Sequence, residues 1–427
     1  MTYELDTIRA QFPALSLTDD GRPRIFFDNP AGTQVPLAVA ESMSEYLLNS
    51  NANMSGFFTT SQQTDRVIAE AHDAMADFLS APYSSELVFG QNMTTITLHL
   101  SRSIGRMLSA GDEIVLSRMD HDANVAPWLL LAEDLRLEVR WLPFNLETFE
   151  FDREQIESTI TTRAKLVCIG GASNLLGTIN DVRTIAALAR EVGALTYVDA
   201  VQLAPHVPID VQDLGCDFLV CSAYKFFGPH QGVLWGRREL LEQMTAYKVR
   251  PAYDRPPFKY ETGTQSHEGM AGTTAAINYF AWIGETFAGD YHPKNAGFAG
   301  RRRHLRSAMQ YLFDYERELT AYFLSQLSAV TGLRVYGITD EAALDRRVPT
   351  VAFTVDGCDP EAIAKGLAQR NIFVWNGHNY AVELVKCLGL MDAGGVVRVG
   401  PVHYNSREEI DRLMGALEEI IPAARAA

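Results

Sequence analysis

Residues 220–232, VCSAYKFFGPHQG, place a lysine at the point where a buried strand should end. The apolar run at 218–221 is typical of such a strand, and the Gly228-Pro229 pair breaks regular structure after it. Burying the ammonium group of Lys225 is unfavourable unless the group is paired or chemically modified. The segment therefore raises the question of what Lys225 binds.

Strand-like and helix-like patterns alternate on both sides of this segment. Short apolar runs predict strands at 86–89, 112–116, 137–142, 165–169, 195–198 and 218–221. Helical periods are expected from residue 94, around 124–134 and at 182–192, the last with Asp181 as N-cap and Gly193 after its end. Apolar strands separated by amphipathic helices predict an α/β fold with a mainly parallel sheet covered on both faces.

The last third of the chain follows a different pattern. A long helix near 301–328 leads into strands at 333–336, 350–354 and 396–399, and a final helix covers about 406–420. A chain of 427 residues is also too long for one ordinary core. We therefore predict a large domain at residues 21–300 and a smaller α+β domain formed by residues 1–20 and 301–427.

Composition limits the classes of partner. The 37 Lys and Arg residues against 53 Asp and Glu residues give a net charge of −16, which argues against nucleic acid or an anionic membrane. The five cysteines include no CxxC pair, as expected of a reduced intracellular protein. The first residues do not resemble a signal peptide, and no apolar stretch approaches the ~18–20 residues of a membrane span. We expect a soluble, cytoplasmic protein.

Polar residues follow the ends of several predicted strands, where ligands bind in open parallel sheets. Thr94 and Thr95 begin a helix after the first strand, a place suited to phosphate, although an ordinary N-cap threonine gives the same pattern. Asp120, His121 and Asp122 follow the second strand; adjacent residues rarely converge on one ion, so we predict no metal. An exposed loop histidine or an aromatic surface over a flat ligand is expected there instead. The later strand ends contribute Asn174, Asp199, Ser222 and Lys225.

A single cofactor would account for this set. Pyridoxal phosphate requires a lysine for its Schiff base, an acid at the pyridine nitrogen, a phosphate cradle and a planar contact on the ring. As an imine, Lys225 would no longer need the hydration of an ammonium, and Asp199 would keep the ring nitrogen protonated. A surface lysine and a helix-capping aspartate would give the same two residues, so the pattern alone leaves both explanations open.

The ordered motifs of the chain resemble those of the class V aminotransferase family, and within it the cysteine desulfurase-like branch. They run from FFDNPAGTQVP (26–36) through QNMTT, MDHDANVAPW, GGASNLLGTIND, YVDAVQLAPHVPIDVQDLGCDF, CSAYKFFGP, ETGTQSHEG and WNGHNYAVEL to VVRVGPVHYNSREEID. The resemblance implies fold type I of the pyridoxal phosphate enzymes, with a seven-stranded, mainly parallel sheet in the large domain. It also implies a homodimer in which both subunits contribute to each active site.

The resemblance further implies roles for individual residues. Lys225 would form the Schiff base, Asp199 would pair with the pyridinium, and His121 would stack on the ring and could also move protons. Asn174 and Gln202 would contact the phenolic oxygen of the cofactor. The phosphate would be held by Thr94, Thr95, Ser222, Tyr224 and, from the neighbouring subunit, Thr264. The substrate would be bound by Asn29, His378, Tyr380 and the carboxylate clamp Arg398.

Two positions depart from the family pattern. Tyr224 stands where the family usually has a histidine on the phosphate side, and a tyrosine can still donate a hydrogen bond to phosphate. Tyr380 stands where true desulfurases of this branch carry a nucleophilic cysteine, and a phenol with a pKa near ~10 cannot accept sulfur as a thiolate does. The nearest cysteine, Cys387, follows the apolar residues Leu384 and Val385 and is expected to be a core residue.

We therefore expect a pyridoxal phosphate-dependent enzyme acting on a small α-amino acid, with Lys225 as general base at Cα. The resemblance favours a C–S or other β-elimination lyase without a persulfide cysteine. Transamination and epimerisation are the first alternatives, and a true cysteine desulfurase that uses Cys387 is the second. A non-enzymatic binding protein that keeps the fold is the third; it would lack the absorption band near ~420 nm that bound cofactor gives.

Overall fold

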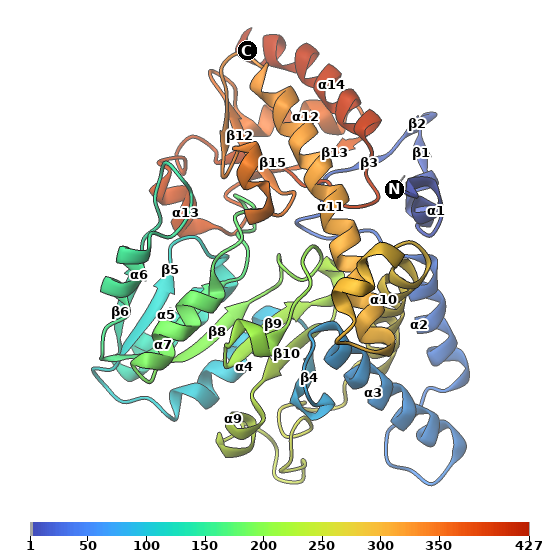
Figure 1. Cartoon of the computed structure of the whole chain (residues 1–427), viewed down its shortest axis with the longest axis vertical. Coiled ribbons are helices and arrows are strands. Elements are labelled where there is room, and N and C mark those ends of the chain that lie inside the picture. Colours follow the sequence, from blue (N-terminus) through green and yellow to red (C-terminus); the bar gives the residue numbers. More distant parts are fainter. Residues whose placement is uncertain (1–2, 427) are drawn as a thin grey trace.

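The computed structural model describes residues 3–426 and contains two main sheets with helices around them (Figure 1). The larger sheet has seven strands in the order β4-β10-β9-β8-β7-β5-β6. These strands are β4 (Leu87–Gly90), β5 (Glu113–Ser117), β6 (Glu138–Leu142), β7 (Ala164–Gly170), β8 (Leu195–Asp199), β9 (Phe218–Ser222) and β10 (Gly232–Gly236). Within this sheet β10 alone runs antiparallel to its neighbours, so the predicted α/β fold with a mainly parallel seven-stranded sheet is confirmed.

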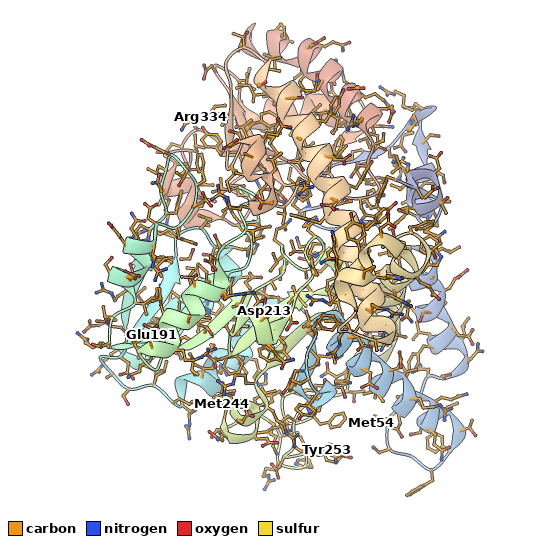
Figure 2. All side chains as sticks on the ribbon, in the orientation of Figure 1. Met54, Glu191, Asp213, Met244, Tyr253 and Arg334 are labelled. Carbon is orange, nitrogen blue, oxygen red and sulfur yellow. The ribbon has the colours of Figure 1, made fainter. Side chains whose placement is uncertain are left out.

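Both faces of the large sheet are buried, which explains why its strands are continuous apolar runs in the sequence. In β9, Phe218 and Val220 pack into the core on one face, whereas Leu219 and Cys221 pack into the core on the other. The first face is covered by α4 (Met93–Gly105) and α5 (Ala126–Leu135). The second is covered by α3 (Thr59–Phe78), α7 (Val182–Glu191) and α10 (His267–Thr286). Side chains fill the space between these layers (Figure 2).

The sequence patterns located six strands of this sheet to within one residue at each end, and missed the seventh. The predicted caps of α7 are also confirmed, since the Asp181 side chain accepts a hydrogen bond from the Thr184 amide and Gly193 has a φ of 75°. The strand that was missed, β10, lies between β9 and β4. Its first residue, Gly232, packs so closely on α4 that a Cβ there would come within 2.5 Å of the Asn92 backbone.

A second, antiparallel sheet forms the C-terminal part of the chain, with the strand order β11-β12-β15-β14. Its strands are β11 (Leu333–Tyr336), β12 (Val351–Val355), β14 (Trp375–Gly377) and β15 (Val396–Val399). The helices α12 (Pro360–Ala368) and α14 (Arg407–Ala426) pack on it. The sequence predicted three of these strands, but the three-residue strand β14 was not expected. β14 leads into the loop that carries His378 and Tyr380.

The long helix α11 (Gly300–Ser328) joins the two parts of the molecule (Figure 1). Leu305 and Leu312, in its first half, belong to the core of the large sheet, whereas Leu319 and Phe323 belong to the core of the small one. The helix therefore fixes the two sheets relative to each other through one continuous hydrogen-bonded backbone.

The N-terminal residues pack on the C-terminal part. The Tyr3 hydroxyl donates to the carbonyl of His403 at 2.8 Å, and Arg9 forms an ion pair with Glu409 at 3.0 Å. The short strand β3 (Ile25–Phe26) pairs with β13 (Ile372–Phe373), and Ile25 lies in the core of the small sheet. Phe26, the other residue of β3, lies in the core of the large sheet. β3 thus contacts both parts of the molecule, and the domain boundary at residue 21 stays a prediction. No helix within residues 3–426 is long and apolar enough to cross a bilayer.

Candidate active site

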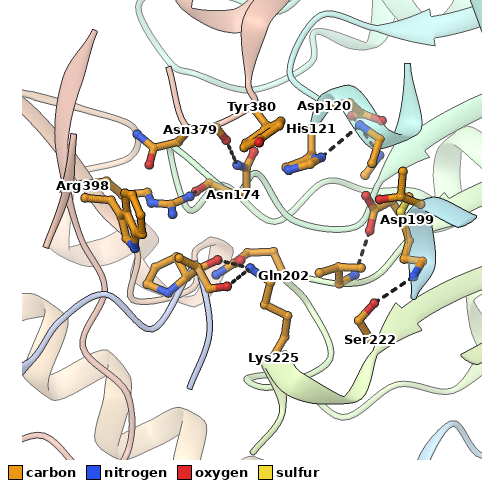
Figure 3. A pocket seen from close by; sticks show the side chains of 18 of the residues that line it. Asp120, His121, Asn174, Asp199, Gln202, Ser222, Lys225, Asn379, Tyr380 and Arg398 are labelled. Atoms are coloured by element: carbon orange, nitrogen blue, oxygen red, sulfur yellow. Dashed lines mark hydrogen bonds between the residues drawn. The ribbon is translucent and has the colours of Figure 1, made fainter. Parts of the chain in front are cut away.

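A cavity of about 650 Å³ lies between the carboxyl ends of the large sheet's strands and the small sheet (Figure 3). The strand ends contribute Gly170, Asp199 and Ser222. The start of α4 contributes Met93 and Thr94, and the loop after β5 contributes Asp120 and His121. The small sheet contributes residues 375–380 and Arg398, and the N-terminal segment contributes Pro30 and Ala31. Chain segments far apart in sequence therefore meet where open parallel sheets bind their ligands.

Lys225 ends the short turn that follows β9 and is only 9% exposed. Its Nζ donates hydrogen bonds to the backbone carbonyls of Pro30 and Ala31, the latter at 2.9 Å. Burial, with repulsion from Arg398 as the second cause, lowers the pKa of Lys225 to about 7. A large part of the Lys225 amine is therefore unprotonated and nucleophilic near neutral pH.

Two carboxylates lie buried beside the cavity at the ends of strands. Burial raises the pKa of Asp199 to about 6, while the Val201 amide, which donates to Asp199 Oδ1 at 2.9 Å, acts in the opposite direction. Burial raises the pKa of Asp120 to about 7; its oxygens accept hydrogen bonds from the Gly170 amide and the Asn124 side chain. The sequence considered Asp120 only within a rejected metal site and did not predict it as part of this cavity.

His121 is held in one tautomer. Its Nδ1 accepts a hydrogen bond from the Ala123 amide at 3.0 Å, so the proton of the neutral ring is on Nε2. Burial, followed by the charges of Lys225 and Arg398, lowers the pKa of His121 to about 3. The ring stacks on Tyr380, with 5.3 Å between centroids and 15° between planes. His121 therefore offers a neutral, flat surface and a single N–H donor.

The loop after β14 forms the wall that carries Tyr380. Asn379 and Tyr380 both have left-handed backbone conformations, with φ of 50° and 59°. The Asn174 amide donates to the carbonyl of Asn379 at 2.8 Å, and the Asp122 backbone amide donates to the carbonyl of Tyr380 at 2.7 Å. Left-handed non-glycine residues need such outside support, and here both supports come from the large sheet's loops.

Arg398 lies on β15 and is 4% exposed. One of its Nη atoms donates to the Asn174 carbonyl at 3.0 Å. The buried Nε of Arg398 and the buried Oδ1 of Asn174 have no hydrogen-bond partner among residues 3–426. Burial lowers the pKa of Arg398 to about 10, so it stays charged at neutral pH. Unpaired buried polar atoms at a cavity wall are suited to a polar ligand.

The N-terminus of α4 forms the other end of the cavity. The Met93 amide donates to Ser222 Oγ at 3.1 Å, and the Asn92 side chain caps the helix by accepting from the Thr95 amide at 2.9 Å. Thr94, in the first turn of α4, also lines the cavity. Backbone amides, hydroxyls and the positive end of a helix dipole together make a site for phosphate.

These observations fit pyridoxal phosphate. The lysine is buried with a lowered pKa, a buried carboxylate lies near it, and a hydroxyl and amide cradle stands at one end of the cavity. The unpaired Asn174 Oδ1 adds a polar atom that still needs a partner. Asp199 is available to the ring nitrogen, and Arg398 to the carboxylate of an amino acid.

Comparison with known proteins decides the family. The family model for class V aminotransferases matches residues 25–302 and 294–413. The chain belongs to the class V aminotransferase family. The predicted family, fold type I architecture, enzyme class and pyridoxal phosphate dependence are thereby confirmed.

Several of the proteins that are similar to this class V family member in sequence or structure are cysteine desulfurases. It is 33% identical to the aminotransferase-like protein FGM3 of Gibberella zeae, over 98% of this chain and 99% of that protein. It is 29% identical to a cysteine desulfurase of Yersinia pestis, with the same coverage. Its structure resembles the cysteine desulfurase of Thermococcus onnurineus, with a TM-score of 0.83, 28% identity and 99% of both chains covered. The cysteine desulfurase CsdA of Escherichia coli gives 0.82, with 26% identity, and 99% and 100% covered.

Most of the predicted site residues line this family member's cavity. They are Thr94, His121, Asn174, Asp199, Gln202, Ser222, Tyr224, Lys225, His378, Tyr380 and Arg398. Thr95 and Thr264 line a neighbouring cavity instead. Gln202 donates a hydrogen bond to Thr350 Oγ1 at 3.1 Å.

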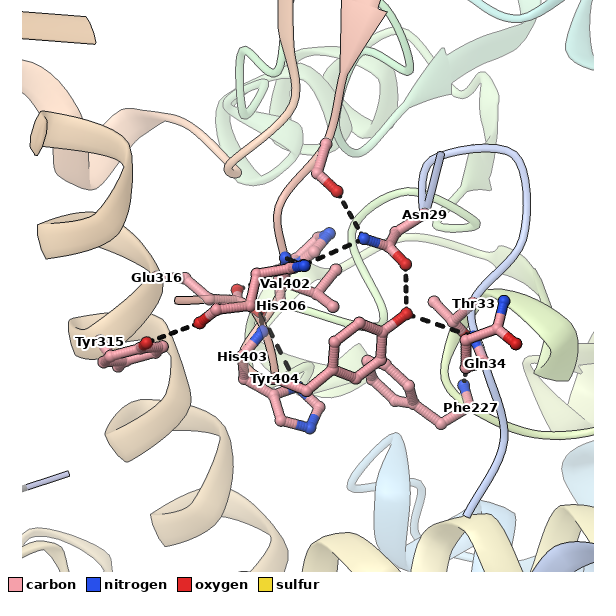
Figure 4. Close-up of polar contacts among 12 residues, drawn as sticks. Asn29, Thr33, Gln34, His206, Phe227, Tyr315, Glu316, Val402, His403 and Tyr404 are labelled. Atoms are coloured by element: carbon pink, nitrogen blue, oxygen red, sulfur yellow. Dashed lines mark hydrogen bonds and ion pairs between the residues drawn. The ribbon is translucent and has the colours of Figure 1, made fainter. Parts of the chain in front are cut away.

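Asn29 does not line the cavity, although the sequence predicted a substrate contact. It is 2% exposed, and its amide donates to the backbone carbonyls of Phe26 and Gly400 while its oxygen accepts from the Tyr404 hydroxyl (Figure 4). These bonds use the side chain to connect the segment before Pro30 with the segment after Arg398. Asn29 thus stabilises the cavity wall from outside the cavity, by connecting the two segments that carry Pro30 and Arg398.

The lining residues that the sequence did not predict include Asp120, His230, Trp375 and Asn379. Asp120 stands in the quoted motif MDHDANVAPW, directly before the predicted His121, and His230 ends the turn five positions beyond the predicted Lys225. Trp375 and Asn379 stand in the quoted motif WNGHNYAVEL, and Asn379 lies between the predicted His378 and Tyr380. The polar neighbours of predicted residues were therefore the signal that could have found Asp120 and Asn379.

Proposed function

We propose that this enzyme catalyses β-elimination, of a C–S bond or of another β-substituent, from a small α-amino acid without a persulfide intermediate on the protein. The observation that carries the proposal is the cavity wall itself: Lys225, Asp199 and Arg398 converge there, and none of the described residues lining the cavity is a cysteine. Tyr380, a phenol, occupies the loop next to His121.

The roles of the residues follow from their positions. Arg398 binds the substrate carboxylate, because its Nε is unpaired and its fork matches a carboxylate bidentately. Bound pyridoxal phosphate supplies an electron sink for the charge left at Cα when a proton departs. Lys225 accepts that proton, since its lowered pKa of about 7 leaves a large part of its buried amine unprotonated near neutral pH. The β-substituent leaves with the electron pair of its bond to Cβ, and water releases ammonia and a 2-oxo acid.

A cysteine desulfurase reaction through Cys387 is the main competitor, because similar proteins carry that name. Cys387 ends α13 (Val382–Cys387) and packs, partly buried, against the core that contains Leu384 and Val385. It is not among the cavity's lining residues. This placement favours elimination over persulfide formation on Cys387.

We also propose that two copies of the chain share the site. Thr264 lines a cavity outside the one that contains Lys225, so on its own chain it does not complete the phosphate cradle. Large apolar side chains are exposed on the segments near residues 48–58 and 249: Leu48 by 81%, Phe57 by 100%, Phe58 by 60% and Val249 by 66%. Exposed apolar side chains that gather in a patch are typical of an interface between proteins.

The experiment that tests the reaction uses the cofactor-loaded protein with cysteine, cystine, an S-alkyl cysteine and alanine. Elimination gives a 2-oxo acid with ammonia and the thiol or sulfide, whereas desulfuration gives alanine, and transamination of alanine gives a 2-oxo acid without ammonia. We expect the elimination products: a 2-oxo acid, ammonia and the thiol or sulfide. Their formation should be lost in Lys225→Ala and unchanged in Cys387→Ser. Alanine as the product from cysteine, abolished by Cys387→Ser, would establish the desulfurase instead.

Shared sites are tested by mixing two inactive variants, Lys225→Ala and Thr264→Ala. In a mixed dimer, one of the two sites combines an intact lysine with an intact threonine, so activity should return on mixing. A monomeric protein by light scattering, or no recovery after subunit exchange, would contradict the proposal.

A further inference from the structure

Tyr224 and His230 form a stacked pair in the wall of the main cavity. Their ring centroids are 4.9 Å apart and their planes differ by 14°. The Tyr224 ring packs against Gly32, where a Cβ would lie 3.4 Å from Tyr224 Cδ2, and the Tyr224 carbonyl accepts a hydrogen bond from Thr33 Oγ1 at 3.2 Å. The phenol is therefore fixed by the segment that follows Ala31, and it aligns the imidazole of His230.

His230 stands at the boundary between two cavities. It lines the main cavity together with Ser222 and Thr94, and it lines the neighbouring cavity together with Thr95 and Thr264. All four of these hydroxyl residues belong to the predicted phosphate cradle. His230 thus lines both cavities that contain the predicted phosphate-binding hydroxyl residues.

No cationic side chain among the other described lining residues lies at the phosphate end of the cavity. Arg398 and Ser222 lie at opposite ends of the cavity (Figure 3). Lys225 is bonded to carbonyls of the N-terminal segment, and His121 is kept neutral. His378 comes from the loop after β14, on the side of the small sheet. A phosphate dianion at the start of α4 would otherwise meet only neutral donors and the helix dipole.

We propose that His230 is a phosphate-binding residue of this enzyme, which donates an imidazole N–H to the phosphate of pyridoxal phosphate while Tyr224 holds the ring in place. The proposal rests on the attachment of the cofactor at Lys225 and is independent of which reaction follows. It assigns a role to a residue that lies five positions beyond that lysine, after the Gly228-Pro229 turn.

The test compares two probes that differ only in the phosphate, pyridoxal phosphate and pyridoxal. Each is titrated into the cofactor-free protein, and the band near ~420 nm is followed. His230→Phe keeps an aromatic ring for stacking on Tyr224 but cannot donate a hydrogen bond. We expect this variant to bind pyridoxal phosphate about tenfold more weakly, as for a lost hydrogen bond to a charged group, and to bind pyridoxal as the wild type does.

Matched variants complete the test. His99→Phe makes the same change at a histidine that lines only the neighbouring cavity, and it should leave both affinities unchanged. Equal affinities of the wild type and His230→Phe for pyridoxal phosphate would overturn the proposal, as would equal losses for both probes. A wild-type protein that gives no band with either probe would overturn the attachment at Lys225 as well, so the two failures are distinguishable.

Discussion

The side-chain amide of Asn174 is hydrogen-bonded to the backbone carbonyl of Asn379, with 2.8 Å between Nδ2 and O. The backbone carbonyl of Asn174 also accepts from Arg398 at 3.0 Å. One residue after β7 therefore orients both the loop that carries Tyr380 and the guanidinium that is available to the substrate. Asn174 therefore connects the two sheets at the wall of the cavity.

Removing the Asn174 amide should loosen the loop at 377–381. In Asn174→Ala, the left-handed conformations of Asn379 and Tyr380 lose one of their two supports from the large sheet's loops. We expect the backbone amides of Tyr380 and Ala381 to exchange with deuterium about fivefold faster, since a lost neutral hydrogen bond is worth ~1 kcal/mol. Asn180→Ala removes another buried amide, bonded to the Gly170 carbonyl at 2.7 Å, and should leave exchange in this loop unchanged.

Replacing Arg398 by lysine should weaken substrate binding more than it slows the chemical step. The ammonium is a point charge and cannot reproduce a bidentate contact with a carboxylate. We expect KM to rise by roughly 100-fold, corresponding to about 3 kcal/mol, with a smaller change in kcat. An unchanged KM for every amino acid that is turned over would show that the carboxylate binds elsewhere.

Lys225 should destabilise the cofactor-free protein, most strongly at low pH. Its pKa is lowered to about 7 in the folded protein, whereas the unfolded chain keeps its proton up to the ordinary value of 10.5. The charged form is therefore disfavoured by folding, and the penalty is complete below about pH 7 and disappears as the pH rises towards 10.5.

The corresponding measurement is urea unfolding of the cofactor-free wild type and of Lys225→Met at several pH values. Lys225→Met should be more stable by on the order of 3 kcal/mol at pH 6.5, and the difference should shrink as the pH increases. Groups common to both proteins cancel in this comparison. A difference that is constant from pH 6.5 to 9.5 would contradict the lowered pKa.

Asp199→Asn should abolish most activity while leaving the fold intact. Its pKa of about 6 means that the carboxylate is ionised at pH 7.5, and only an ionised group can keep the cofactor's ring nitrogen protonated. We expect kcat to fall by roughly 10²–10³-fold, the usual scale for a lost acid–base partner. Asp199→Glu, which retains a carboxylate, should recover part of the rate; equal rates for the two variants would argue against a role for the charge.

The features that could be predicted from the sequence are those that depend on neighbouring residues. The strands that end at Gly170, Asp199 and Ser222 were predicted because a fully buried strand is a continuous apolar run, and parallel strands bring their carboxyl ends together. Thr94, Asp199 and Lys225 could then be grouped without coordinates. By contrast, β14 has only three residues, and β10 begins and ends with glycine, so neither strand was recognised from its local pattern.

The amino-acid sequence by itself determined the α/β architecture, the family and the lysine at a buried strand end, because periodicity and ordered motifs are properties of neighbouring residues. Only the tertiary structure decided that Asn29 supports the cavity from behind, that Tyr380 stacks on His121, and that Asn174 bonds to Asn379. It alone also set the lowered pKa of Lys225, since the burial and charges responsible come from segments as distant as Pro30 and Arg398. Contacts between residues hundreds of positions apart arise from tertiary packing, and no short stretch of sequence determines that packing.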